Sequence, residues 1–444
     1  MEGEGPAAPG ATALLYLPDA SAVPLPLEPP PGPTAAELLR RLQGALSLPP
    51  VATEALALWM GSPLLAVQLK PRHRPLRVAR RWPELLLRLS TASPEDIGTG
   101  SPLPPPDEPC LQLRRNVFFP KSRELEVQSE ALLRLLYEDA RGQVLGGRLP
   151  LDPAQALALG ALSCRLRLGP FQQGLHTART IRPLLPELLP RAAPRGWGGL
   201  WGALVRRGPR EPPPEQRLLE AFARTPGAGA PPAELHRDFL RRCHELPGYG
   251  CAFFPGAIER PPGGLLGRGG LRPVTVAVGL EGVTIIDPRE KHVLLTLTYP
   301  ELCWELVGAV GQEGDEAMGQ EGDEAAGPPQ LWLEFDGDHE GAPVNRLLRV
   351  FSPQAELMSA LIECCIELGG AGPEQAQAPP PDQAPPPDGP ARGAPLRPRL
   401  QRLATIDYVQ DGQELRRVKP PRRSASFFGR GGSYSAVAGG AEQG

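Results

Sequence analysis

The chain has 444 residues, enough for about two to four domains on the usual prior of about 100–200 residues each. Its 59 prolines and 51 glycines reach the level at which low-complexity segments are expected, so part of the chain is predicted to be linker and tail. The net charge of −3 excludes a global basic field that would attract nucleic acid, and any phosphate or membrane contact needs a local basic patch.

The cysteines and the N-terminal sequence favour a cytosolic protein. The seven cysteines are odd in number and form no C-x-x-C motif, so they are expected to be free thiols in a reducing compartment. The first ten residues, MEGEGPAAPG, lack the basic and apolar regions of a secretory signal. No window reaches about 18 uninterrupted apolar residues, which argues against a membrane span.

After a stretch at 1–11 that is expected to be disordered, residues 12–92 are predicted to form a ubiquitin-like unit. Strands at 13–17 and 22–27 would form a hairpin, and the two prolines of the second strand confine it to a sheet edge. A helix follows, with Thr34 as its N-cap and Glu37 three residues on. Further strands are expected at 55–60, 64–69 and 84–89.

The next unit is predicted to be helical. Residues 93–107 contain little that could form a core and are interpreted as a linker. Residues 108–248 show helical spacing, and the segment 156–166 is apolar nearly all round, as in a buried helix. An insert at 205–233, rich in proline and glycine, is expected to be flexible apart from a short helical piece at 216–222.

A third unit at 249–369 is predicted to be a run of short strands closed by a helix from Gln354 onward. The helical pattern stops at Pro247-Gly248, where proline disfavours helix and glycine permits a tight turn. An acidic loop at 311–327 contains a tandem duplication and is interpreted as a solvated expansion rather than a calcium site. Seven strands favour a sandwich or barrel, and they are expected at 251–258, 273–280, 283–287, 293–299, 302–307, 331–335 and 347–351.

The last segment, 370–444, is expected to be a disordered tail. It is rich in alanine, proline, glutamine and glycine, and it contains few large apolar residues to offset the entropy of ordering. Two denser islands lie within it, at 403–409 and 416–428.

Four motifs in this order resemble those of FERM domains over about residues 12–369. Three of them resemble the helical lobe of that family, and the fourth, Leu246-Pro247-Gly248-Tyr249-Gly250 with Phe253, resembles the start of its third lobe. The resemblance implies an α+β multi-lobe fold. Its parts are a ubiquitin-like lobe, an acyl-CoA-binding-protein-like helical bundle and a PH/PTB-like seven-stranded sandwich with a C-terminal helix. The motifs of the helical lobe are Arg115–Pro120, with 135–137 and 147–150, which resemble its opening, and the segment from 158–162 through 168–169, which resembles its next helix.

Motifs in the tail, at 405–409, 416–420 and 426–428, together with 331–338, resemble one branch of FERM adaptors. That resemblance implies a non-catalytic adaptor that binds the cytoplasmic tails of iRhom pseudoproteases at the cytosolic face of the plasma membrane. There it would stabilise the complex of iRhom with the TNF-converting sheddase and promote shedding. A second implied role is negative regulation of Wnt signalling through a co-receptor tail. The alternative is a phosphoinositide-binding linker between membrane and cytoskeleton. Such linkers carry a charged helical tail, whereas residues 371–444 are rich in proline.

The predicted partner site is a groove of the third lobe. In a fold of this kind the fifth strand is a sheet edge, whose free backbone groups can accept an added peptide strand, and the closing helix forms the other wall. Alternatively, the helix residues are core residues alone. The proposed peptide-binding residues are Leu302, Cys303, Trp304, Glu305 and Leu306 on the strand, and Leu357, Leu361 and Cys364 on the helix. Tyr249, Phe253 and Phe254 are interpreted as packing anchors between lobes.

Two further surface sites are predicted. A basic cluster could meet acidic lipid headgroups, although a solvated face is the simpler explanation; its members are Lys70, Arg72, Arg74, Arg77, Arg80 and Arg81. In the tail, Ser424 and Ser426 follow two arginines, the arrangement that basic-directed kinases favour.

Catalysis, a cofactor and a metal are not expected. The chain lacks H-E-x-x-H, G-x-S-x-G and a phosphate-binding loop. The spacings of His236, Cys243, His244 and Cys251 match no compact zinc pattern, so no metal site is predicted there.

Overall fold

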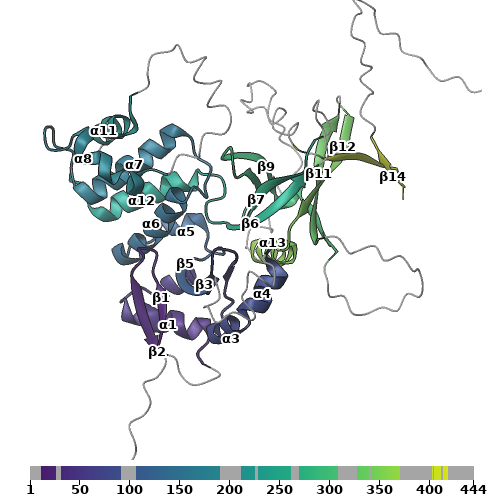
Figure 1. The fold of residues 1–444 in the computed structure, drawn as a ribbon, viewed down its shortest axis with the longest axis horizontal. Coiled ribbons are helices and arrows are strands. Elements are labelled where there is room, and N and C mark those ends of the chain that lie inside the picture. The colour runs from purple at the N-terminus through teal and green to yellow at the C-terminus, as the bar shows by residue number, and fades with distance from the viewer. Residues whose placement is uncertain are drawn as a thin grey trace, which may run out of the picture.

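The computed structural model shows three lobes in chain order, with a strand pair from the tail added to the third (Figure 1). It describes residues 12–26, 32–91, 107–190, 212–225, 229–261, 270–308, 328–339, 342–370, 403, 405–411 and 414–418.

The first lobe is a five-stranded sheet in the order β2-β1-β5-β3-β4, with helices packed against it. The predicted hairpin is confirmed, and its proline-containing strand is an edge of the sheet. The capping box is also confirmed, because the Glu37 amide donates to Thr34 Oγ1 at 3.3 Å and the Thr34 amide donates to Glu37 Oε2 at 2.7 Å. The elements are β1 (Thr12–Tyr16), β2 (Ala22–Pro26), α1 (Ala35–Ala45), α2 (Ala52–Ala55), β3 (Leu56–Gly61), β4 (Ala66–Gln68), α3 (Pro75–Arg80), α4 (Trp82–Leu89) and β5 (Cys110–Arg115).

Two predictions for this part of the chain are wrong. The segment 84–89 is helix α4 and not a strand, because Trp82, Leu86 and Leu89 are buried at helical spacing; a run of leucines shows no period by itself. The segment 110–115, assigned to the helical lobe that was expected from 108, is the central strand β5 of the first sheet. It pairs parallel to β1 and antiparallel to β3.

The second lobe consists of helices around α7, which was predicted to be buried. One side of α7 contributes Leu159 and Leu162 to an apolar cluster shared with the first lobe, and the other contributes Ala161 and Cys164 to a separate cluster. Because it packs on both sides, α7 is apolar nearly all round. The helices are α5 (Lys121–Leu125), α6 (Glu130–Leu145), α7 (Pro153–Leu168), α8 (Ala178–Ile181), α9 (Leu185–Leu188), α11 (Pro214–Arg224) and α12 (Pro232–His244), with a 3₁₀ turn at Arg182–Leu184.

The insert predicted to be flexible at 205–233 contains a full helix, α11. Proline is tolerated in the first turn of a helix, and Leu218 and Phe222 are buried at a spacing of four residues against α7. The helical piece expected at 216–222 is therefore confirmed, and it extends to 214–224, where the prediction of flexibility is wrong at both of its ends.

The third lobe has the seven predicted strands and the closing helix α13 (Ala355–Gly370). The sheet order is β10-β11-β12-β6-β7-β8-β9, and α13 packs on β7, β10 and β11. The strands are β6 (Ala252–Glu259), β7 (Leu271–Gly279), β8 (Gly282–Asp287), β9 (His292–Thr298), β10 (Cys303–Val307), β11 (Gln330–His339) and β12 (Ala342–Phe351). The acidic loop predicted at 311–327 lies outside the described residues, as does the stretch at 1–11.

The tail is not disordered throughout, contrary to the prediction for 370–444. β13 (Ile406–Asp411) and β14 (Glu414–Arg417) form an antiparallel pair, and β13 also pairs with β12 of the third lobe. The composition of the tail could not predict this pairing, because the pairing joins segments about 60 residues apart in the sequence.

A buried polar network fastens the three lobes together. Arg115 at the end of β5 pairs with Glu124 of α5 at 3.3 Å, and the Tyr249 hydroxyl donates to the same carboxylate at 2.8 Å. His244 Nε2 lies 2.8 Å from the other oxygen of Glu124. Burial raises the pKa of Glu124, but Arg115 and the hydrogen bonds from His244 and Tyr249 outweigh it, so the pKa lies below its ordinary value.

Candidate functional site

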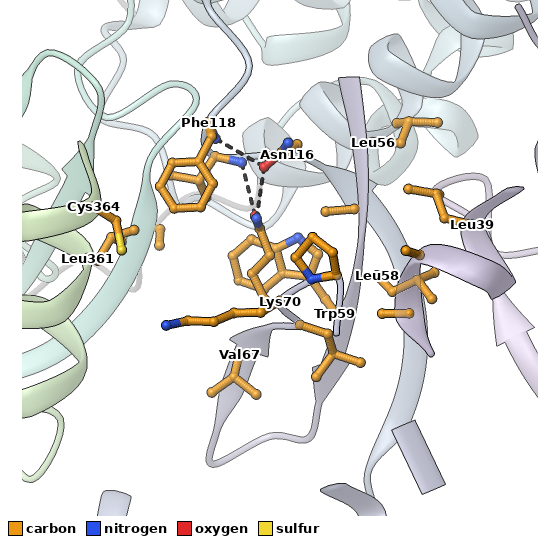
Figure 2. A pocket seen from close by; sticks show the side chains of 18 of the residues that line it. Leu39, Leu56, Leu58, Trp59, Val67, Lys70, Asn116, Phe118, Leu361 and Cys364 are labelled. Carbon is orange, nitrogen blue, oxygen red and sulfur yellow. Dashed lines mark hydrogen bonds between the residues drawn. The ribbon is translucent and has the colours of Figure 1, made fainter. Parts of the chain in front are cut away.

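A cavity of about 460 Å³ lies between the first and third lobes. Its first-lobe wall comes from α1, β3, β4 and the turn at 116–118, and its third-lobe wall comes from β6 and α13. Figure 2 shows Leu361 and Cys364 of α13 on the side opposite Leu39 and Leu58. The walls are largely apolar, with a few polar groups at the rim, which is the usual character of a ligand pocket.

Strand β3 builds the first-lobe wall because both of its faces are buried. Leu58 and Met60 belong to the core shared by the first two lobes, whereas Ala57 and Trp59 belong to the apolar cluster of the third lobe. The Trp59 indole is fixed by a 3.3 Å hydrogen bond from Nε1 to the Arg115 carbonyl oxygen. The Arg114 guanidinium lies 4.5 Å from its ring centroid, a cation–π distance.

Side-chain amides hold the turn at 116–118. Gln68 Nε2 donates to Asn116 Oδ1 at 2.8 Å, and Gln68 Oε1 accepts from the Val117 amide at 3.0 Å. Asn116 Nδ2 donates to the Glu54 carbonyl oxygen at 2.8 Å, and the Phe118 amide donates to Asn116 Oδ1 at 3.1 Å. These amides are therefore engaged in structure, and Figure 2 marks hydrogen bonds of Asn116 as dashed lines.

Two exposed cations, Arg40 and Lys70, complete the lining. Neither forms an ion pair recorded among the described residues. The cavity therefore combines apolar walls with a positively charged rim, which suits an apolar segment that carries acidic groups or a carboxylate.

The three helix residues predicted for the partner groove, Leu357, Leu361 and Cys364, line this cavity. They are half-buried and face the first lobe rather than β10. The opposite side of α13, which includes Met358 and Ile362, fills the third-lobe core. The prediction that these three residues share one face of the helix is correct. The sequence spacing alone could not show which part of the protein that face contacts.

The five strand residues of the predicted groove lie elsewhere. Among the described strands β10 pairs with β11 alone, so it is an edge, as expected. Leu302 is buried in the third-lobe core, and Trp304 and Leu306 pack partly buried against it. Trp304 Nε1 donates to Ser359 Oγ of α13 at 3.2 Å, so Trp304 joins the strand to the helix. The alternate residues, Cys303 and Glu305, are exposed.

The predicted groove residues thus fall into two groups. Leu302 and Trp304 lie on the β10 side of α13, where Trp304 is hydrogen-bonded to Ser359, and Leu357, Leu361 and Cys364 lie on the first-lobe side. The first-lobe wall, above all Trp59, was missed. The sequence feature that could have indicated this wall is the uninterrupted apolar run of β3, which is typical of a strand buried on both faces.

The predicted basic cluster follows β4 and runs through α3. Arg72, Arg77 and Arg80 are exposed, as is Lys70, which belongs also to the cavity rim. Arg74 donates to the Gly32 carbonyl oxygen, and Arg81 pairs with Glu84 at 2.9 Å. The two serines Ser424 and Ser426 lie outside the described residues.

The four residues considered for a metal have separate surroundings. His236 packs against Tyr137 with tilted rings and a centroid distance of 4.8 Å, and burial lowers its pKa to about 4. Cys243 is buried, His244 binds Glu124, and Cys251 lies beside Gly279. Within the described ranges, no three His, Cys, Asp or Glu side chains gather as metal ligands. In the same ranges no helix is both long and apolar enough to cross a bilayer.

Comparison with known proteins gives two family matches. The model of the FERM central domain matches residues 122–254, and the model described as the KRIT1/FRMD8 FERM domain C-lobe matches residues 272–361. FERM domain-containing protein 8 of Mus musculus is 46% identical over 96% of this chain and 92% of its own length, and that of Homo sapiens is 46% identical over the same shares. Among solved structures, the human myosin 7b C-terminal MyTH4-FERM domain, in complex with the harmonin-a PDZ3 domain, aligns with a TM-score of 0.48. It is 13% identical over 81% of this chain and 60% of that one.

Proposed function

Since the chain belongs to the family of FERM domain-containing protein 8, we propose that it is a non-catalytic adaptor that binds the cytoplasmic tails of iRhom pseudoproteases. Bound at the cytosolic face of the plasma membrane, it would stabilise the complex of iRhom with the TNF-converting sheddase and promote ectodomain shedding. A Wnt co-receptor tail is a second proposed partner, through which the protein would lower Wnt signalling.

The cavity between the first and third lobes is the observation that carries this proposal. An extended tail segment could place one or two apolar side chains between Leu361 of α13 and Trp59 of β3. Acidic groups of the same segment would meet Arg40 and Lys70 at the rim. The cavity replaces the β10 groove as the proposed site because Leu357, Leu361 and Cys364 face it.

A binding experiment with matched variants separates these two sites. Leu361→Glu places a charge on the apolar wall of the cavity, and Glu305→Arg reverses the charge on the exposed side of β10. We expect Leu361→Glu to weaken binding of a purified iRhom cytoplasmic tail by about tenfold or more, because interface centres tolerate unpaired charge poorly. We expect Glu305→Arg to leave the affinity within about twofold.

Thermal denaturation of each variant controls for folding. Loss of binding by Glu305→Arg alone would move the site back to the β10 edge. Wild-type protein that fails to bind the iRhom tail at all would contradict the proposed partner. Where the tail binds, crosslinking mass spectrometry of the complex would identify the lobe that it contacts.

The alternative role, a phosphoinositide-binding linker, is favoured by the exposed arginines of α3. Each cation near an anionic surface contributes on the order of 1 kcal/mol. Paired substitution Arg77→Glu with Arg80→Glu leaves the cavity lining intact. If this role holds, the substitution should abolish flotation with vesicles that contain phosphoinositide, whereas Arg242→Glu on α12 should not. Equal flotation of the Arg77→Glu, Arg80→Glu protein and the Arg242→Glu protein would exclude the lipid-binding role. Phosphorylation of Ser424 and Ser426 stays a prediction.

A further inference from the structure

Strand β12 has one edge that two different strands share. Its first edge pairs with β11 along the whole strand. On the second edge, β6 pairs with Val350 and Phe351 near the end of β12. β13 of the tail pairs with Asn345, Arg346 and Leu347 on the same edge. The tail strand therefore covers backbone groups of a sheet edge that β6 leaves open.

Arg346 of β12 clamps the tail strand. Its guanidinium forms an ion pair with Asp407 at 3.1 Å and donates to Thr405 Oγ1 at 3.3 Å. The same group also donates to the Asp338 carbonyl oxygen of β11 at 2.8 Å. Gly337 makes this possible, because a Cβ there would collide with the Arg346 side chain. The charge pair has a fixed geometry on the native sheet rather than being a chance surface contact.

Apolar and aromatic contacts lie on either side of this clamp. Leu403 is 4% exposed and belongs to the apolar cluster of the third lobe. Tyr408 lies opposite Asn345, and burial, with Glu334, raises its pKa to about 12. The tail thus contributes a buried aliphatic anchor, an acidic residue and an aromatic residue at fixed spacing. This is how peptides that add a strand to a sheet are usually recognised.

The tail strand β13 pairs with β12 over a shorter stretch than a strand of the sheet core does. Three backbone pairs join β13 to β12, whereas ten join β11 to β12. The 32 residues 371–402 connect the end of α13 to Leu403. Covalent attachment gives the segment an effective concentration on the order of millimolar at the edge, so even a weak strand ligand stays largely docked.

We propose that the Asn345–Leu347 edge of β12 is a strand-binding site and that the chain's own segment 403–418 is its ligand, exchanging between docked and released states. The site is separate from the cavity, whose lining includes no residue of β12. When the segment is released, the edge is open to an extended peptide with the same pattern: an aliphatic residue four positions before an acidic one, followed by an aromatic residue.

Hydrogen exchange on the full-length protein tests the docked state. Asp407→Arg places two cations together, so backbone amides of 406–410 should exchange about tenfold faster or more than in the wild type. Arg346→Asp combined with Asp407→Arg restores opposite charges and should recover much of the protection. Asp238→Arg, the same change beside Arg241 on α12, should leave these amides unaffected.

A labelled peptide of residues 401–420 tests the site as a binding surface. It should bind the Asp407→Arg protein, whose edge is vacated, and bind the wild type about tenfold more weakly or not at all. It should also fail to bind the charge-swapped double variant, because the carboxylate introduced by Arg346→Asp would repel Asp407 of the peptide. Binding that persists in the double variant would place the peptide elsewhere and overturn the proposal.

Two other results would also contradict the proposal. Fast exchange of 406–410 in the wild type, equal to that in Asp407→Arg, would mean that the segment is not docked. Slow exchange in both proteins, with no peptide binding, would make the strand pair a permanent part of the fold rather than a ligand.

Discussion

The Tyr249 hydroxyl donates a 2.8 Å hydrogen bond to Oε1 of Glu124, and neither side chain has appreciable contact with solvent. The bond joins the start of the third lobe to α5 of the second, next to Arg115 of the first. A buried carboxylate that loses a donor keeps its desolvation cost. Tyr249→Phe should therefore lower the free energy of unfolding in urea by about 1–3 kcal/mol. The same change at Tyr16, which is exposed, should leave it unchanged, and equal effects at both positions would contradict the role of this bond.

His236 should make stability depend on pH. Burial, with a smaller contribution from Arg134, lowers its pKa to about 4 in the folded protein, against about 6.5 in the unfolded chain. Between these values only the unfolded state binds the proton, so the free energy of unfolding should fall as the pH is lowered from about 6.5 to about 4. Above about pH 6.5 the His236 imidazole is neutral in both the folded and the unfolded state, so its contribution to the free energy of unfolding is constant.

His236→Phe tests this linkage, since it keeps an aromatic ring against Tyr137 and removes the proton. Urea unfolding at pH 7 and pH 5 should show a loss of about 1–2 kcal/mol in the wild type that the variant lacks. An identical pH dependence in the two proteins would mean that His236 is not the group responsible.

Trp304 and Ser359 should be coupled. Their 3.2 Å hydrogen bond joins β10 to α13, so Trp304→Phe and Ser359→Ala should each remove the same interaction. A double-mutant cycle in urea should give a coupling of about 0.5–1.5 kcal/mol. Neither change should alter iRhom-tail binding at the cavity, and additive effects on stability would show that the bond contributes nothing.

Helix α4 can be tested with two matched substitutions. Leu86 is 1% exposed and Leu87 is 46% exposed. Leu86→Ala should cost about 2–5 kcal/mol through the lost contacts and the cavity left behind. Leu87→Ala should change stability by less than about 0.5 kcal/mol. The reverse order would match the strand predicted at 84–89, in which Leu86 and Leu87 would lie on opposite faces.

Local signals predicted much of the fold. The alternation of Val274, Val276 and Val278 identified β7, and the Thr34 and Glu37 pair identified the start of α1, because both patterns depend on residues close in the chain. By contrast, β5 and β13 are stabilised by partners far away in sequence, and neither has a strong local pattern. The leucine run of α4 is compatible with both the helical period and the strand period, so it could not distinguish them.

The candidate site was predicted only in part for a related reason. The stripe of Leu357, Leu361 and Cys364 is visible in the sequence, but its direction depends on how two lobes dock. Trp59 comes from the lobe on the other side of the cavity. No spacing rule connects residues from separate lobes.

The position of β5 has a consequence for synthesis on the ribosome. A nascent chain that ends near residue 91 contains β1 and β3 but not the strand between them, so two sheet edges await a partner. The first lobe can close only when Arg115 has left the exit tunnel. Because Arg115 also binds the Phe119 carbonyl oxygen and Glu124, completion of the first lobe positions the first helix of the second. The two lobes are therefore expected to fold as one cooperative event rather than as successive domains.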